Sequence, residues 1–185
     1  ESLGTLGATQ VRFLYGFPFA LAIAAISHLA TGSSVPRMGG SFVLFTLAGA
    51  ISQVLGTALM LAAMRQRTFV VVTAWTKTEP VQVAVFGMVV LGDRIPLLGM
   101  LAIVIATVGV TIMARKPAAS EQGSAGWQSV AMGLLAGACF AIAAVTYRGA
   151  ILALGDGHFL AHATWTVTCG LLVQTIVLGG WMLMF

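Results

Sequence analysis

The sequence predicts an all-α fold, a polytopic transmembrane helical bundle, and two observations lead to this prediction. The first is composition. Of the 185 residues, 59% are hydrophobic and 8% are charged, whereas a typical soluble domain is about 45–50% apolar and about 25% charged. The mean hydropathy is +1.01. With 9 basic and 5 acidic residues, the chain has too little charge to cover a soluble surface. This composition excludes a soluble enzyme, a disordered tail and a disulfide-stapled secreted domain.

The second observation is a series of apolar runs, each close to the roughly 20 residues that a membrane-spanning helix needs. The runs are continuous rather than alternating, so strands of a membrane barrel do not fit them. Helices, in contrast, satisfy every backbone polar group within the lipid. Six spans are therefore predicted, over residues 4–30, 41–64, 68–91, 95–114, 129–154 and 159–185.

Five breaks separate the six predicted spans. The first break is rich in Gly, Ser and Pro, and the second, third and fifth are short polar turns. The fourth is the one long linker, ARKPAASEQGSAGW, in which charged residues, Pro and small residues occur together. In chain order, the breaks lie at 31–40, 65–67, 92–94, 114–127 and 155–158.

The ends, the net charge and the cysteines add little. The chain begins at Glu1 rather than Met and stops at Phe185 within an apolar run, so a fragment of a longer protein is expected. The net charge of +4 is scattered among apolar runs and forms no stripe that could follow a phosphate backbone, so no nucleic-acid partner is expected. Cys139 and Cys169 lie inside apolar runs and are interpreted as packing thiols.

The third span carries two charges well inside it, Lys77 and Glu79. A charge at the centre of a membrane helix costs about 2.5–3.5 kcal/mol on insertion scales, so each of the two needs a reason. They lie about 200° apart around a helix and would pair poorly with each other. Each is expected to meet another helix, a water-filled cavity or a ligand, and Arg12 and Arg148 are candidate partners for Glu79.

Pro80 predicts a kink in the same segment, because it lacks an N–H and frees the carbonyl oxygen of Thr76. Trp75, Glu79 and Gln82 share one stripe of the helix at spacing i, i+4, i+7. A helix that is bent and polar at mid-membrane is where transporters hold substrates and coupling ions, and this interpretation is favoured. The alternative is an ion-pair network that only joins helices.

Other polar residues inside the spans are candidates for the wall of the cavity that would hold the substrate at this bent helix. Arginines near a helix end can instead extend to the lipid headgroups, and amides or hydroxyls can instead hydrogen-bond between helices. Both alternatives stay open. Gly133 and Gly137 form a GxxxG pattern that predicts close helix packing. The wall candidates are Arg12, Tyr15, Gln53, Tyr147 and Arg148, with the same ambiguity at Thr57, Trp165 and Gln174.

The stretch TEPVQVAVFGMVVLGDRIPLLG at 78–99, closed by GVTIM at 109–113, resembles the EamA-like repeat of the drug/metabolite transporter superfamily. In that family, a helix with a mid-span Pro runs into an L-G-E/D-R turn, and a glycine-rich helix ending in a G-V pattern follows. QVRFL at 10–14 resembles the arginine that members often carry near the start of their second helix. Asp93 stands where Glu is commoner, a mild departure at a turn.

The resemblance implies about ten helices in two inverted five-helix repeats, of which this chain would hold six. Residues 1–115 would be helices two to five of the first repeat, 116–128 the linker, and 129–185 the first two helices of the second repeat. The resemblance implies a multi-pass secondary transporter of the inner (plasma) membrane, which moves amino acids or drug-like compounds by alternating access. It also implies that the linker lies outside the cell. Loop Lys and Arg, four against two, place it in the cytoplasm instead, so the orientation stays open.

On this interpretation the protein is not an enzyme, and no catalytic residue, metal or cofactor is expected. The expected partners are the lipid bilayer and a small-molecule substrate. A coupling proton and a second copy of the chain, which would form a homodimer, are further candidates. Lys77 would attract an anionic group, and Glu79 would be a counter-charge or proton site. Two alternatives are a membrane-embedded metal-dependent enzyme built on His158 and His162, and a non-transporting assembly subunit. The substrate-binding candidates are Trp75, Lys77, Glu79, Pro80, Gln82, Arg12, Tyr15, Gln53, Tyr147 and Arg148.

Overall fold

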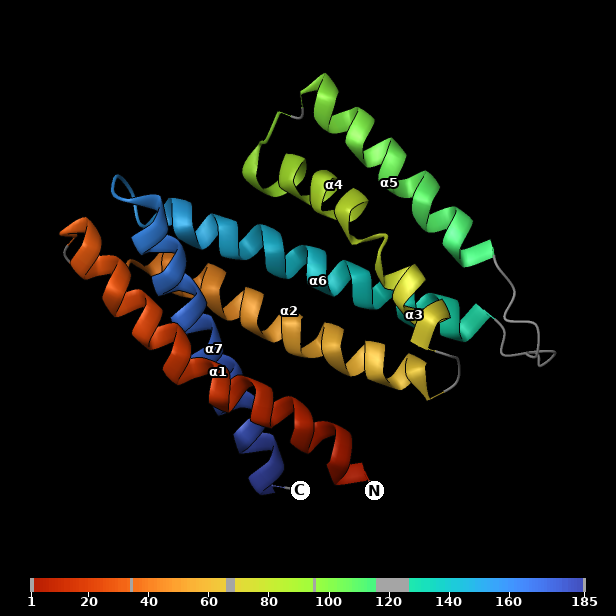
Figure 1. The fold of residues 1–185 in the computed structure, drawn as a ribbon, viewed down its shortest axis with the longest axis horizontal. Coiled ribbons are helices and arrows are strands. Elements are labelled where there is room, and N and C mark those ends of the chain that lie inside the picture. Colours follow the sequence, from red (N-terminus) through yellow and green to blue (C-terminus); the bar gives the residue numbers. More distant parts are fainter. Residues whose placement is uncertain (1, 34, 66–68, 95, 116–126, 185) are drawn as a thin grey trace. The chain divides into compact units, whose positions relative to one another are not determined.

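A computed structural model describes residues 2–33, 35–65, 69–94, 96–115 and 127–184. These residues form helices and connecting turns, and they contain no strand (Figure 1). In chain order the helices are α1 (Ser2–Thr31), α2 (Gly40–Met64), α3 (Phe69–Thr76), α4 (Glu79–Leu91), α5 (Leu97–Arg115), α6 (Trp127–Ala153) and α7 (Phe159–Met184).

The structure confirms a polytopic helical bundle. Among the described residues, four helices are long and apolar enough to cross a membrane, as the spans Thr9–Thr31, Gly40–Met64, Val130–Ala153 and Phe159–Met184. Shorter apolar helices run over Glu79–Leu91 and Leu97–Gly109.

The third predicted span is not one helix. α3 ends at Thr76 and α4 begins at Glu79, so the expected kink is a complete break. Of the predicted linker at 116–128, residues 116–126 lie outside the described residues. The ten-helix plan of two repeats stays a prediction.

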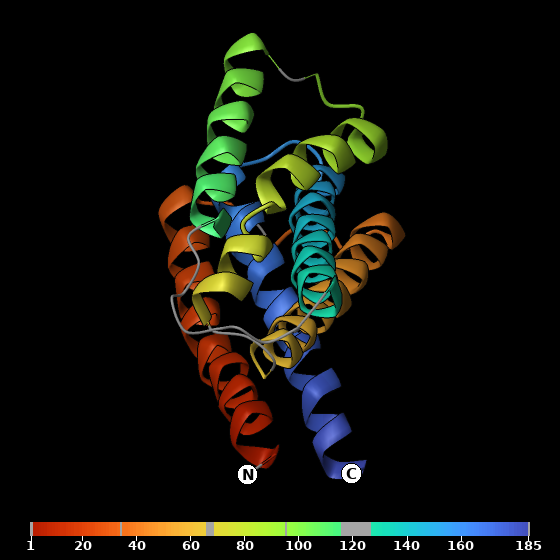
Figure 2. The same ribbon diagram turned by 90° about the vertical axis from the view of Figure 1, so that its right-hand side faces the viewer.

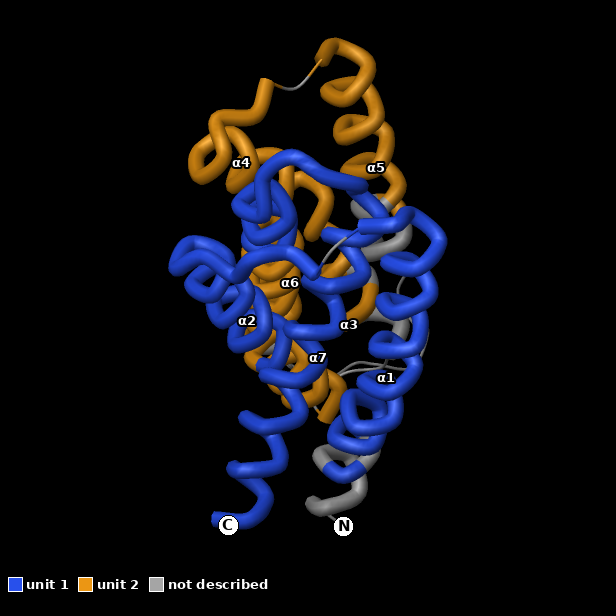
Figure 3. Tube along the Cα trace, turned by 90° about the vertical axis from the view of Figure 1, so that its left-hand side faces the viewer, with its two compact units in different colours: residues 1–54, 146–185 blue, residues 55–145 orange. Residues whose placement is uncertain are grey.

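The chain divides into two compact units (Figure 3). Unit 1 comprises residues 1–54 and 146–185, and unit 2 comprises residues 55–145. The division cuts through α2 and α6, so each of these helices contributes to both units.

In unit 1, α1 and α7 pack side by side in opposite directions, with the start of α1 and the end of α7 at the same end of the pair (Figures 1 and 2). Near that end, the Gln10 side-chain amide donates a hydrogen bond to the carbonyl oxygen of Thr175, at 3.2 Å. Toward the opposite end, the rings of His28 and Trp165 meet edge to face with centroids 6.0 Å apart. One hydrogen bond and one ring contact thus fix the register of the pair.

α1 ends where the backbone turns left-handed at Gly32, with φ +63°. The N–H of Ser33 then donates to the carbonyl oxygen of His28 at 3.2 Å, which closes the helix end. The His28 ring nitrogen Nδ1 lies 3.3 Å from the carbonyl oxygen of Ser33. A carbonyl only accepts, so Nδ1 is the donor in this contact.

In unit 2, the first part of α6 packs against the broken third span through its two glycines. A Cβ placed on Gly133 would lie 2.9 Å from Cβ of Trp75, and one placed on Gly137 would lie 3.0 Å from the carbonyl oxygen of Thr76. These distances confirm the close packing that the GxxxG pattern predicts. α4 ends at Leu91, and Gly92 caps it in the left-handed conformation, with φ +68°.

Candidate functional site

The break between α3 and α4 is the first candidate site, and its backbone explains why it forms. Pro80 stands in the first turn of α4, where its missing N–H costs nothing. The same missing N–H leaves the Thr76 carbonyl without its usual helical donor. None of the described backbone N–H groups at the break donates to that oxygen. The Thr76 carbonyl thus has no backbone donor among the described residues, and it lies against Gly137 of α6.

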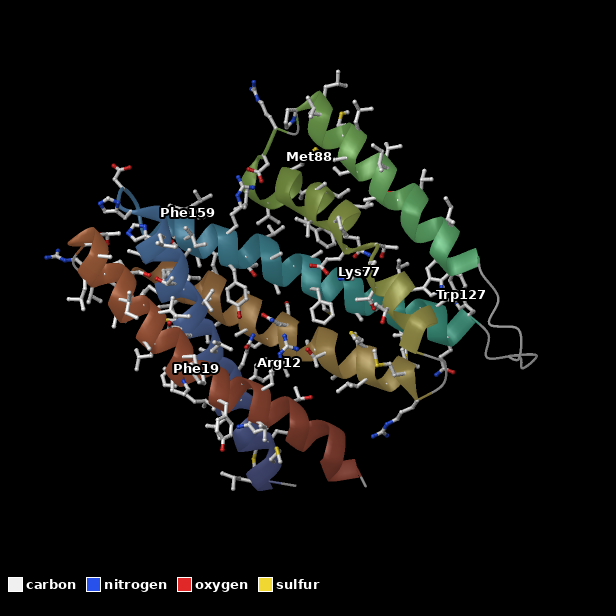
Figure 4. All side chains as sticks on the ribbon, in the orientation of Figure 1. Arg12, Phe19, Lys77, Met88, Trp127 and Phe159 are labelled. Atoms are coloured by element: carbon white, nitrogen blue, oxygen red, sulfur yellow. The ribbon has the colours of Figure 1, made fainter. Side chains whose placement is uncertain are left out.

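The two charges at the break stand at helix ends that suit their signs. Lys77 is labelled in Figure 4. Lys77 follows the last residue of α3, where the carbonyl end of the helix is negative, and Glu79 is in the first turn of α4, where the N–H end is positive. Lys77 is exposed and Glu79 is half-buried. Within unit 2, neither side chain forms an ion pair with another described residue. Among the described residues of this unit, these two charges therefore do not form the ion-pair network of the alternative interpretation.

The side of the break that faces α6 is held by hydrogen bonds. The Thr78 hydroxyl donates to the carbonyl oxygen of Trp75 at 2.8 Å. Gln82 Nε2 donates to that hydroxyl at 3.0 Å and reaches the Leu134 carbonyl of α6 at 3.4 Å. Sequence reasoning missed Thr78 as the residue that joins the two halves. Its position directly before Glu-Pro, where a helix N-cap is common, was the available signal.

A second polar cluster lies in unit 1, inside three membrane helices. Gln174 of α7 is 1% exposed. Its Nε2 donates to Gln53 Oε1 of α2 at 3.0 Å and to Tyr147 Oη of α6 at 3.0 Å. Gln53 and Tyr147 were candidates from the sequence, whereas Gln174 was left ambiguous between packing and binding.

The remaining candidates in unit 1 lie outside these hydrogen bonds. Tyr15 of α1 is 64% exposed, and Arg12 is exposed with its guanidinium carbon 6.0 Å from the ring centroid of Phe13 (Figure 4). Arg148, directly after Tyr147, is also exposed.

The structure thus places the ten candidates in two groups. Trp75, Lys77, Glu79, Pro80 and Gln82 gather at the break in unit 2. The other five belong to unit 1, which brings Gln53 and Tyr147 together through Gln174. That all ten line one cavity stays a prediction, and so does the pairing of Glu79 with an arginine of unit 1.

The histidines of the metal-enzyme alternative lie at the start of α7. His158 precedes the helix and is exposed, and His162 is buried in its first turn. Among the described residues, no group of three or more His, Cys, Asp or Glu side chains is arranged to hold a metal ion. No observation therefore favours this alternative.

Comparison with known proteins identifies the family. The model of the EamA-like transporter family matches residues 1–115, which include the whole of the broken third span. No curated protein and no solved structure matches the chain. Because the match covers 115 of the 185 residues, the chain belongs to the EamA-like transporter family and is a membrane transporter of the drug/metabolite type.

Proposed function

We propose that the protein is a secondary transporter of the inner (plasma) membrane that moves small anionic or zwitterionic metabolites, amino acids foremost, by alternating access. The observation that carries this proposal is the break between α3 and α4, an interruption of a predicted span that holds two charges. Irregular backbone is tolerated at membrane depth only where it is buried in protein or lines a water-filled cavity.

The polarity of the break favours a ligand with an anionic group. Lys77 is the exposed charge, and its ammonium group has no carboxylate partner among the described residues of unit 2. Leaving a charge unpaired within a span costs several kcal/mol unless water or a ligand meets it. An incoming carboxylate supplies the missing counter-charge. Amino acids carry this carboxylate, which favours them within that class.

Glu79 suits a different role, because it is a half-buried carboxylate in the first turn of α4. In our proposal, it binds the coupling proton or balances Lys77 when the site is empty. Gln at this position keeps the shape and removes the charge. Glu79→Gln therefore separates a charge role from a packing role.

The test is uptake of an equimolar mixture of L-amino acids into liposomes that contain the full chain, with and without an imposed proton gradient. Lys77→Ala is expected to lower uptake by about 10- to 100-fold, the effect of losing a hydrogen bond to a charged group. Glu79→Gln is expected to abolish the response to the gradient. Arg37→Ala and Asp156→Asn are matched controls, because both side chains are exposed in loops.

The outcomes separate function from site. If both variants transport like the wild type at equal membrane abundance, the site assignment is wrong. If the wild-type protein moves no amino acid in either direction, the proposed substrate class is wrong.

A further inference from the structure

Tyr147 is held in a narrow slot in unit 1. A Cβ placed on Gly170 of α7 would lie 2.7 Å from the phenol oxygen, and one placed on Gly49 of α2 would lie 3.1 Å from a ring carbon. The first contact is shorter than real Cβ atoms make, and the second would require the ring to move by a few tenths of an ångström. Two glycines on two different helices therefore fix the plane and the depth of the ring.

Gln174 fixes the direction of the phenol hydroxyl. An amide nitrogen has two N–H donors, and Gln174 uses one on Gln53 and the other on Tyr147. Because Tyr147 Oη accepts a hydrogen bond from this amide, its own hydrogen must point elsewhere. No described residue of unit 1 accepts that hydrogen. The cluster therefore presents one preset O–H donor, on a side chain that is not fully buried.

The charges of unit 1 indicate what such a donor would meet. The membrane spans of this unit contain Arg12 and Arg148 and no Asp or Glu. No acidic side chain in these spans would repel a negatively charged acceptor, and a carboxylate is a strong acceptor of this kind among small metabolites.

We propose that Tyr147 donates a hydrogen bond to the carboxylate of the transported molecule, and that Gln174 is the positioning residue that aims this donor. The inference rests on the proposed function for the substrate and adds a second recognition element, separate from Lys77. An analogue without the carboxylate leaves the donor unpaired in a low-dielectric site, so the carrier should prefer the acid over the matching amine by about 10- to 100-fold.

The test follows the phenol itself and needs no transport. The chain has two tyrosines, so protein labelled with carbon-13 at the tyrosine Cζ gives two NMR signals, and Tyr147→Phe assigns them. L-phenylalanine and phenethylamine are the probes, because they differ by the carboxylate alone. We expect the Tyr147 signal to shift with L-phenylalanine and other L-amino acids, and to stay in place with the amine.

The positioning role is tested with a matched pair of variants. Gln174→Leu should reduce the preference for acid over amine to less than about threefold in a thermal-shift titration. Gln10→Leu is the control, because it too removes hydrogen bonding between helices, the part-buried bond from Gln10 to Thr175. It should leave the preference unchanged. If Gln174→Leu does not fold, Gln174→Met replaces it, since the unbranched thioether keeps the length of the side chain but cannot donate.

Each outcome has one meaning. A Tyr147 signal that responds to no amino acid, or equally to acid and amine, would overturn the inference, as would an equal loss of preference in Gln10→Leu. The proposed function fails differently, because the phenol signal reports binding even when nothing crosses the membrane.

Discussion

Gly137 of α6 packs against the backbone at the break, and replacing it with Ala tests the packing described for unit 2. The added Cβ would lie 3.0 Å from the Thr76 carbonyl oxygen and 3.3 Å from the Thr78 hydroxyl. The nearest of these atoms belongs to the backbone and cannot swing aside, so the helices must separate by a few tenths of an ångström.

The expected magnitude follows from two opposing effects. Overpacking of a tight contact costs about 1–3 kcal/mol. Replacing Gly by Ala inside a helix returns about 0.5–1 kcal/mol. The net prediction for Gly137→Ala is a destabilisation of about 0.5–2 kcal/mol.

The assay is unfolding of the purified protein in detergent, with Gly109→Ala as the matched control. Gly109 lies in α5 of the same unit, and a Cβ placed on it meets no atom within 4 Å. The control should therefore be neutral or more stable than the wild type. If Gly137→Ala is as stable as Gly109→Ala, the close approach of α6 to the break is refuted.

Three further predictions use the same unfolding assay. Gly170→Ala places its Cβ 2.7 Å from the Tyr147 phenol oxygen. The substitution should therefore destabilise the protein by about 1–3 kcal/mol and shift the Tyr147 NMR signal. An unchanged signal would contradict the close contact between Gly170 and the Tyr147 ring. Thr78→Val removes the hydroxyl that joins the two halves of the break and should cost about 0.5–1.5 kcal/mol. Thr164→Val, whose hydroxyl bonds only to carbonyls of its own helix, should cost less, and equal losses would count against the role of Thr78. Gly32→Ala forces a left-handed residue at φ +63° and should cost about 1–2 kcal/mol; no loss would show that α1 ends differently.

The sequence predicts the long spans well because length and hydropathy are local properties. α2 and α7 begin and end within one residue of the predicted spans. Pro80 likewise predicts a kink, since its effect acts within one turn. The full break needed a partner as well. Gly137, far along the chain, lets α6 approach the backbone at Thr76 closely.

The site residues were harder to predict because their roles depend on tertiary structure. For Lys77 and Glu79 the sequence indicated missing partners, but the helix ends that favour each charge exist only once the span is broken. Gln174 lies 121 residues from Gln53 and 27 from Tyr147, and no periodicity shows which helix faces meet over such separations.

The pairing of α1 with α7 has a consequence for how the protein is made. The Gln10–Thr175 hydrogen bond joins residues 165 positions apart. At about 5–20 residues synthesised per second, the first helix waits roughly 8 to 33 s for its partner. Unit 2 is one continuous stretch, residues 55–145, and all of it leaves the ribosome before α7 does. We therefore expect unit 2 to fold first during insertion, while α1 stays in the bilayer or with the insertion machinery until the last helix arrives.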